Sequence, residues 1–80
     1  MDRWAKLVPE LLVTDISASL KFWVDICGFA VLYGRMEEGS AYLDYEGAQV
    51  MLEEQGGRNW VTGPLVTSFG RGVNFQITVL

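Results

Sequence analysis

Histidine is absent from this sequence, and cysteine occurs once, at Cys27. Without histidine, the chain lacks the side chain that most often binds metals and transfers protons near neutral pH. A single cysteine excludes a disulfide within the chain and fits a reducing compartment. Because no histidine is present to activate the Cys27 thiol, we expect a buried structural residue rather than a nucleophile.

Basic residues are few, and long apolar runs are missing. Six Lys and Arg stand against ten Asp and Glu, which gives a net charge of −4 and no basic cluster to track phosphates. Residues 4–13 are interrupted by Lys6, Pro9 and Glu10, so they resemble neither a membrane span nor a signal peptide. We therefore expect a cytoplasmic protein without a nucleic-acid or membrane partner.

What is present is a large apolar content in a short chain. Half of the 80 residues are hydrophobic, which is too many for a disordered segment. A chain of this length buries only about 60% of the surface that its unfolded form exposes. We expect a single domain over residues 1–80 that gains stability from a second subunit.

The first part of the chain predicts a strand followed by a helix. Residues 7–13 form the expected strand, with Pro9 favouring a position at its edge or start. Thr14 or Asp15 offers an N-cap for a helix over residues 16–27, and Gly28 ends it. One face of that helix carries an apolar stripe formed by Ile16, Leu20, Trp23 and Cys27.

The rest of the chain predicts further strands. The expected order is a strand over 29–33, a charged turn over 34–39, strands over 40–46 and 48–54 joined at Gly47, a long loop over 55–71, and a strand over 72–80. Alternation along these strands predicts an apolar face made by Leu7, Leu11, Val13, Leu43, Val50, Leu52, Val73, Phe75, Ile77 and Val79. The opposite face carries Glu10, Tyr42, Asp44, Gln49, Met51, Glu53, Asn74, Gln76 and Thr78. That second face is either plain solvent-facing surface or the lining of a cleft.

Residues 8–15, 19–23 and 27–29, in that order, resemble the vicinal-oxygen-chelate superfamily, which includes glyoxalase I, extradiol dioxygenases, fosfomycin-resistance enzymes and bleomycin-resistance proteins. Residues 41–53, 58–60 and 70–76 continue the likeness and look closest to the bleomycin-resistance branch. The resemblance implies an α+β fold, in which a βαβββ module packs one helix on a mixed or antiparallel curved sheet. Residues 6–54 would form this module, and residues 72–80 would resemble the opening strand of a second one. In such families, two modules together enclose a cleft.

The resemblance places metal ligands at three positions, which here hold Val8, Met51 and Asn74. Valine has no donor atom and methionine is a soft, weak ligand, so these residues do not make a catalytic divalent site. Lewis-acid chemistry would then have no electrophile. We therefore expect no cofactor and lean against an enzyme.

The resemblance to bleomycin-resistance proteins implies metal-free binding of an antibiotic or metabolite in a cleft completed by another subunit, and the carboxylates of the polar face would favour a cationic ligand. The predicted ligand-binding residues are Glu10, Tyr42, Asp44, Gln49, Met51, Trp60, Phe69, Asn74 and Gln76. We expect a homodimer with exchanged or paired C-terminal strands. Two alternatives remain open: a truncated half-module that assembles without specific binding, and a metal-dependent lyase or dioxygenase of the same superfamily.

Overall fold

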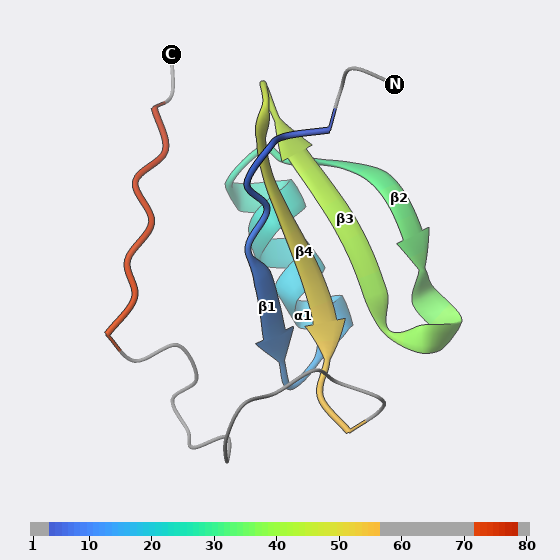
Figure 1. The fold of residues 1–80 in the computed structure, drawn as a ribbon. Helices are drawn as coiled ribbons and strands as arrows, with labels where there is room; N and C mark the ends of the chain where they lie inside the picture. The colour runs from blue at the N-terminus through green and yellow to red at the C-terminus, as the bar shows by residue number, and fades with distance from the viewer. Residues whose placement is uncertain (1–3, 57–71, 79–80) are drawn as a thin grey trace.

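The computed structural model describes residues 4–56 and 72–78 (Figure 1). Within them, the elements follow in the order β1 (Glu10–Val13), α1 (Ile16–Leu20), the π-helix η1 (Lys21–Ile26), β2 (Ala30–Arg35), the short 3-10 helix η2 (Met36–Glu38), β3 (Ser40–Tyr45) and β4 (Ala48–Glu54). The described residues form a four-stranded sheet in the order β1-β4-β3-β2. Strand β1 runs parallel to β4, whereas β3 is antiparallel to both of its neighbours.

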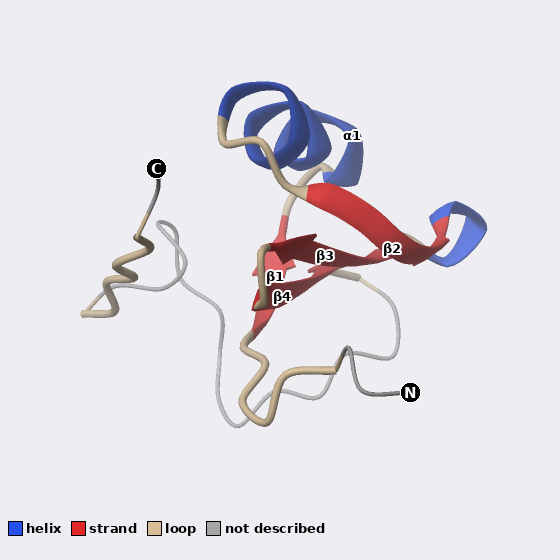
Figure 2. Ribbon diagram, turned by 90° about the horizontal axis from the view of Figure 1, so that it is seen from above, coloured by secondary structure: helices blue, strands red, loops and turns tan. Residues whose placement is uncertain are grey.

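The helical layer covers one face of this sheet, and in the part of the chain that the structure describes no helix lies on the other face (Figure 2). A parallel pair needs a crossover, and the helix between β1 and β2 belongs to that crossover. The expected α+β class, with a βαβββ module and one helix on a mixed sheet, is confirmed.

The helix begins where the sequence predicts. The Asp15 side chain is the N-cap and accepts a hydrogen bond from the backbone N–H of Ala18, at 3.1 Å. From Lys21 onward the winding widens, and the N–H of Cys27 donates to the carbonyl of Phe22, five residues back, at 3.0 Å. Gly28 then takes a φ of +85°, which ends the helix as expected.

The hairpin between β3 and β4 turns on two residues. Glu46 and Gly47 both have positive φ, at 49° and 96°. Two consecutive positive φ values are typical of a type I′ turn, whose twist matches that of the flanking strands. The predicted hairpin around Gly47 is confirmed.

The core lies between the helical layer and the sheet. Its buried residues are Ile16, Phe29, Ala41, Leu43, Val50 and Leu52, and Leu43 and Leu52 have no exposed surface. Packed against this cluster are Leu11, Val13, Leu20, Trp23, Cys27, Tyr45 and Ile77. The predicted helix stripe therefore faces the core throughout its length, and Cys27 contributes to packing.

Three strand predictions need correction, two of them at strand ends. The first strand starts at Glu10 instead of residue 7, and Leu7 is 82% exposed rather than part of the apolar face. Pro9 has no N–H to donate, although its carbonyl accepts a hydrogen bond from the N–H of Met51, at 2.9 Å. The strand predicted over 29–33 extends to Arg35, so the expected turn is shorter and contains η2.

Residues 73–78 were expected to be a strand, but they pair with none of the four strands. Val73 and Phe75 are 57% and 45% exposed, whereas Ile77 packs against the core. Val79, from the same predicted apolar set, lies outside the described residues. Among the residues described, no helix combines the length and the apolar character that crossing a membrane requires.

Candidate functional site

The sheet face opposite the helical layer carries a set of polar and aromatic side chains. In the strand register, Tyr42 lies opposite Met51, and Asp44 lies opposite Gln49. Glu10 is the β1 partner of Met51. These side chains alternate with the buried residues of the same strands, so they share one face. We call this surface the open face; it unites Glu10, Tyr42, Asp44, Gln49 and Met51 as predicted.

Gln49 organises one end of the open face although it is only 4% exposed. Its Oε1 accepts a hydrogen bond from the Tyr42 hydroxyl at 2.7 Å, and its Nε2 donates to Oδ1 of Asp44 at 2.9 Å. The same Asp44 oxygen accepts from the backbone N–H of Gly47, at 3.2 Å. We call Tyr42, Asp44 and Gln49 the Gln49 network. Its bonds fix the orientation of the amide and hold the Asp44 carboxylate and the Tyr42 ring in place.

The N-terminal segment lies on the same side of the sheet as this network (Figure 2). The Trp4 ring stands edge-on to the Tyr42 ring, with 4.9 Å between centroids and an interplanar angle of 80°. The backbone N–H of Ala5 donates to Oε1 of Gln49, at 2.8 Å. Gln49 Oε1 therefore accepts one hydrogen bond from β3 and another from the N-terminal segment.

Two carboxylates lie together where β1 meets β4. Glu53 belongs to the open face because it is in register with Ser40 on β3 and alternates with buried Leu52. Partial desolvation raises the pKa of Glu10, although its side chain is largely exposed; the charge of Glu53 and a hydrogen bond with it raise the pKa further. A cation bound at this edge would relieve the repulsion between the two carboxylates.

The opposite edge of the face, on β2, carries a basic residue. Nε of Arg35 donates to the Tyr33 hydroxyl at 2.6 Å, and its guanidinium lies 5.6 Å from the centroid of that ring. The hydrogen bond to Tyr33 is the main cause that raises the Arg35 pKa above its ordinary value. Arg35 also pairs with Glu38 at 3.6 Å, and more than half of both side chains is exposed. The open face thus runs from a basic, aromatic edge to an acidic one.

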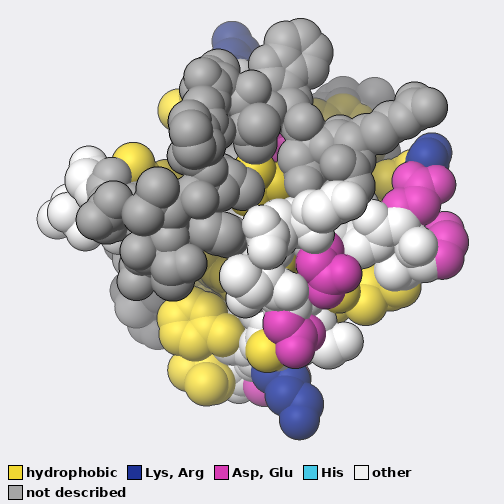
Figure 3. All heavy atoms as spheres, turned by 90° about the horizontal axis from the view of Figure 1, so that it is seen from below, with side chains coloured by type: hydrophobic (Ala, Val, Ile, Leu, Met, Phe, Trp, Pro, Cys, Tyr) yellow, Lys and Arg dark blue, Asp and Glu magenta, His cyan; other side chains and the backbone are white. Residues whose placement is uncertain are grey.

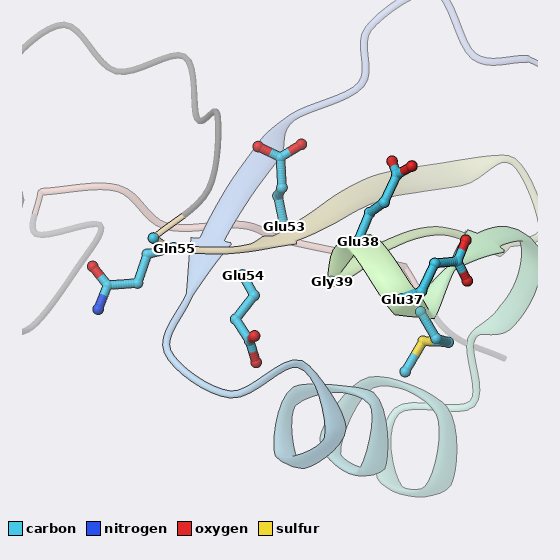
Figure 4. Close-up of a pocket in the computed structure, with 8 residues that line it drawn as sticks. Glu37, Glu38, Gly39, Glu53, Glu54 and Gln55 are labelled. Carbon is cyan, nitrogen blue, oxygen red and sulfur yellow. The ribbon is translucent and has the colours of Figure 1, made fainter.

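A hollow of about 810 Å³ lies at the end of the sheet, between η2 and the end of β4 (Figure 4). Its charged lining consists of Glu37, Glu38, Glu53 and Glu54. The molecule seen from below shows acidic side chains on this end (Figure 3). Figure 4 shows Glu38 and Glu53 pointing to one side of the sheet while Glu54 points towards the helix. Glu54 is engaged there, since its Oε2 accepts from the N–H of Ile16 at 2.9 Å.

The residues at the metal positions implied by the resemblance do not fit a divalent site. Val8 lacks a donor atom, Met51 offers only a thioether, and Asn74 belongs to the segment that does not join the sheet. Within residues 4–56 and 72–78, no group of three or more Cys, Asp or Glu side chains is arranged to hold a metal ion. No step of the function proposed below depends on a metal.

The remaining predicted site residues are not part of the open face as described. Asn74 and Gln76 are exposed on segment 72–78, which pairs with none of the four strands. Trp60 and Phe69 lie outside the described residues. The sequence reasoning missed Trp4, since its contact with Tyr42 joins residues far apart in the chain and no local pattern signals it.

The order β1-β4-β3-β2, with a helical crossover and a parallel β1–β4 pair, defines a βαβββ module. Solved structures that resemble it include the following two. The crystal structure of a glyoxalase/bleomycin resistance protein/dioxygenase superfamily member from Vibrio splendidus 12B01 has a TM-score of 0.55 and 47% sequence identity, covering 56% of this chain and 39% of that one. SMU.1112c has a TM-score of 0.51 and 20% identity, covering 90% of this chain and 59% of that one; it supports the fold alone.

The 47% identity to the Vibrio protein over 56% of this chain, together with the shared βαβββ topology, supports a relationship to the glyoxalase/bleomycin resistance protein/dioxygenase superfamily. The chain spans less than two thirds of the length of either solved relative. No family model matches the sequence, and no curated protein matches it.

Proposed function

We propose that the protein binds a small molecule on the open face, without a metal, in a cleft that a second module completes. The observation that carries this proposal is the Gln49 network, which holds a carboxylate and an aromatic ring in fixed positions on one face of the sheet. Small-molecule sites commonly combine apolar or aromatic walls with a few placed polar groups.

The chemistry of the open face favours a ligand that donates hydrogen bonds or carries positive charge. Oδ2 of Asp44 accepts no hydrogen bond from the described residues, whereas Oδ1 accepts two. Glu10 and Glu53 add negative charge at the β1 edge of the same face. Between these groups, Met51 supplies a polarizable apolar surface in register with Tyr42.

A second module is part of this proposal because a single sheet of this size offers a wall rather than an enclosed cleft. The part of this chain that aligns with the Vibrio protein covers 39% of that protein. We therefore propose that another copy of the chain, or further sequence, supplies the facing wall. Pairing of C-terminal strands between two copies is the arrangement that we favour, because residues 73–78 alternate apolar and polar side chains outside the sheet.

Metal-free bleomycin is a suitable probe, since it is a bulky cation and the sequence looks closest to the bleomycin-resistance branch. Titration should change the tryptophan fluorescence in a saturable way, with half-saturation below tens of micromolar, and copper-loaded bleomycin should be compared with it. The Asp44→Asn variant should weaken binding at least about tenfold, since a charge-assisted hydrogen bond contributes about 1.5–3 kcal/mol.

Asp25→Asn is the matched control, because Asp25 is exposed on η1, in the layer on the other side of the sheet. It makes the same change in net charge and should leave the affinity unaltered. No fluorescence change with either form of bleomycin would argue against an antibiotic of this type. An equal loss of affinity in the two variants would place the effect in net charge rather than at the Gln49 network.

A further inference from the structure

We propose that residues 4–9, which we call the strap, form a displaceable cover over the Gln49 network. A ligand of the open face would then compete with the strap for the same atoms of that network. The inference rests on the proposed function, because it states how access to that site is controlled. The strap runs across the side of the sheet opposite α1 before β1 begins at Glu10 (Figure 2).

The strap occupies groups that a ligand would use. The N–H of Ala5 takes one acceptor position of Gln49 Oε1, at 2.8 Å, and the Tyr42 hydroxyl takes another, at 2.7 Å. The Trp4 ring sits against the Tyr42 ring, with 4.9 Å between their centroids. A ligand that stacked on Tyr42 or bonded to Gln49 would have to replace these contacts.

Much of the strap is exposed to solvent. Trp4 remains 48% exposed and Leu7 82% exposed, and Lys6 is exposed between them. The strap forms no strand until Glu10, and its backbone hydrogen bond to β4, from the N–H of Met51 to the carbonyl of Pro9, lies at its last residue, next to β1. Segments with little burial and few backbone hydrogen bonds open locally at low free energy while the core stays folded. Opening of the strap would uncover the Gln49 network without unfolding the sheet.

Hydrogen exchange of the wild-type chain tests the opening directly and needs no ligand. The Ala5 amide should exchange at least tenfold faster than the amides of β4, at a rate that low concentrations of urea leave unchanged. Exchange of the Ala5 amide at the same rate and with the same urea dependence as those of β4 would overturn the proposal, because the strap would then open only with the whole fold.

Calorimetric titration with metal-free bleomycin tests the competition in three variants. Trp4→Ala removes the aromatic contact, and Ala5→Pro removes the N–H donor while Trp4 stays in place. Both should bind at least about fivefold more tightly than the wild type. Leu7→Ala is the control within the strap, since Leu7 is almost fully exposed, and its affinity should equal that of the wild type.

Weaker binding by Trp4→Ala would show that Trp4 is a wall of the site, and unchanged binding by both variants would show that the strap does not compete; either result overturns the proposal. If bleomycin binds to none of the proteins while the Ala5 amide exchanges by local opening, the proposed ligand is wrong, whereas the proposed opening of the strap is retained. If binding is saturable and the Ala5 amide exchanges with β4, the proposed function stands and the displaceable strap fails.

Discussion

The carboxylate of Glu54, at the end of β4, accepts a hydrogen bond from the backbone N–H of Ile16, at the start of α1, with 2.9 Å between Oε2 and N. The two residues are 38 positions apart in the chain. Together with the Asp15 cap on Ala18, this bond satisfies N–H groups that the first helical turn leaves without intrahelical partners. It also fixes the end of the sheet to the start of the helix that covers it.

Replacing Glu54 with alanine should lower the free energy of unfolding by about 1 kcal/mol, which is the usual cost of losing a capping acceptor. Glu54→Gln should cost less, because its amide oxygen still accepts the bond, although it loses the favourable charge at a helix N-terminus. Urea denaturation measures both. Asp25→Ala serves as the control because Asp25 is exposed and lies beyond that first turn; a loss as large there would contradict the role assigned to Glu54.

Gly39 cannot carry a side chain without disturbing Glu54. Its φ is +68°, and an added Cβ would lie 2.9 Å from the Cβ of Glu54, which is closer than real contacts of this kind. Gly47 has a similar φ of +96° but nothing within 4 Å of the added atom. Gly39→Ala should therefore destabilise the fold by more than Gly47→Ala, whose cost of about 1–2 kcal/mol is backbone strain alone. Thermal or urea unfolding measures the stability of the two variants. Equal losses of stability would mean that the end of β4 moves aside without cost.

Hydrophobic periodicity predicted the core because the buried side chains of both the helix and the strands recur at regular intervals along the sequence. Ile16, Leu20 and Trp23 face the sheet as their spacing indicates, and Leu43 and Leu52 are fully buried. The widening of the helix at Lys21 could not be predicted, since the side-chain pattern of residues 16–27 suits a regular α-helix equally well. Tertiary packing decides such a change, and a single sequence carries no sign of it.

The candidate site divides in the same way. Strand alternation was enough to bring Tyr42, Asp44, Gln49 and Met51 to one face, because β3 and β4 form an adjacent hairpin with a defined turn. Asn74 and Gln76 required residues 72–80 to join the sheet, which is a long-range pairing that residues 73–78 do not make. Strand alternation therefore identified the open face, but it could not show which distant segments of the chain join or cover that face.

The core of this small domain should be sensitive to the loss of volume at its centre. Leu43 is fully buried between the helical layer and the sheet, so Leu43→Ala should cost about 2–5 kcal/mol through lost burial and a residual cavity. Leu7→Ala makes the same chemical change at a side chain that is 82% exposed, and it should alter stability by less than about 0.5 kcal/mol. Urea denaturation of both measures the difference; a small loss at Leu43 would indicate that the sheet and helix repack.

Glu10 should make stability depend on pH in a direction opposite to that of most carboxylates. Desolvation, and then the charge of Glu53, raise the pKa of Glu10 in the folded protein above its ordinary value of 4.5. Its contribution to stability is therefore fully present below that value and is lost as the pH rises through the raised pKa. Glu10→Gln should be more stable than the wild type near pH 7, by less than about 1 kcal/mol because the exposed charges are screened, and the gain should disappear as the pH falls below the ordinary value. Urea denaturation at both pH values, with Glu37→Gln as a control at an exposed carboxylate outside the pair, measures the effect. High salt should reduce the part of the added stability of Glu10→Gln that comes from removing the repulsion with Glu53. If the variant stays equally stabilised at low pH, the raised pKa of Glu10 is not the cause.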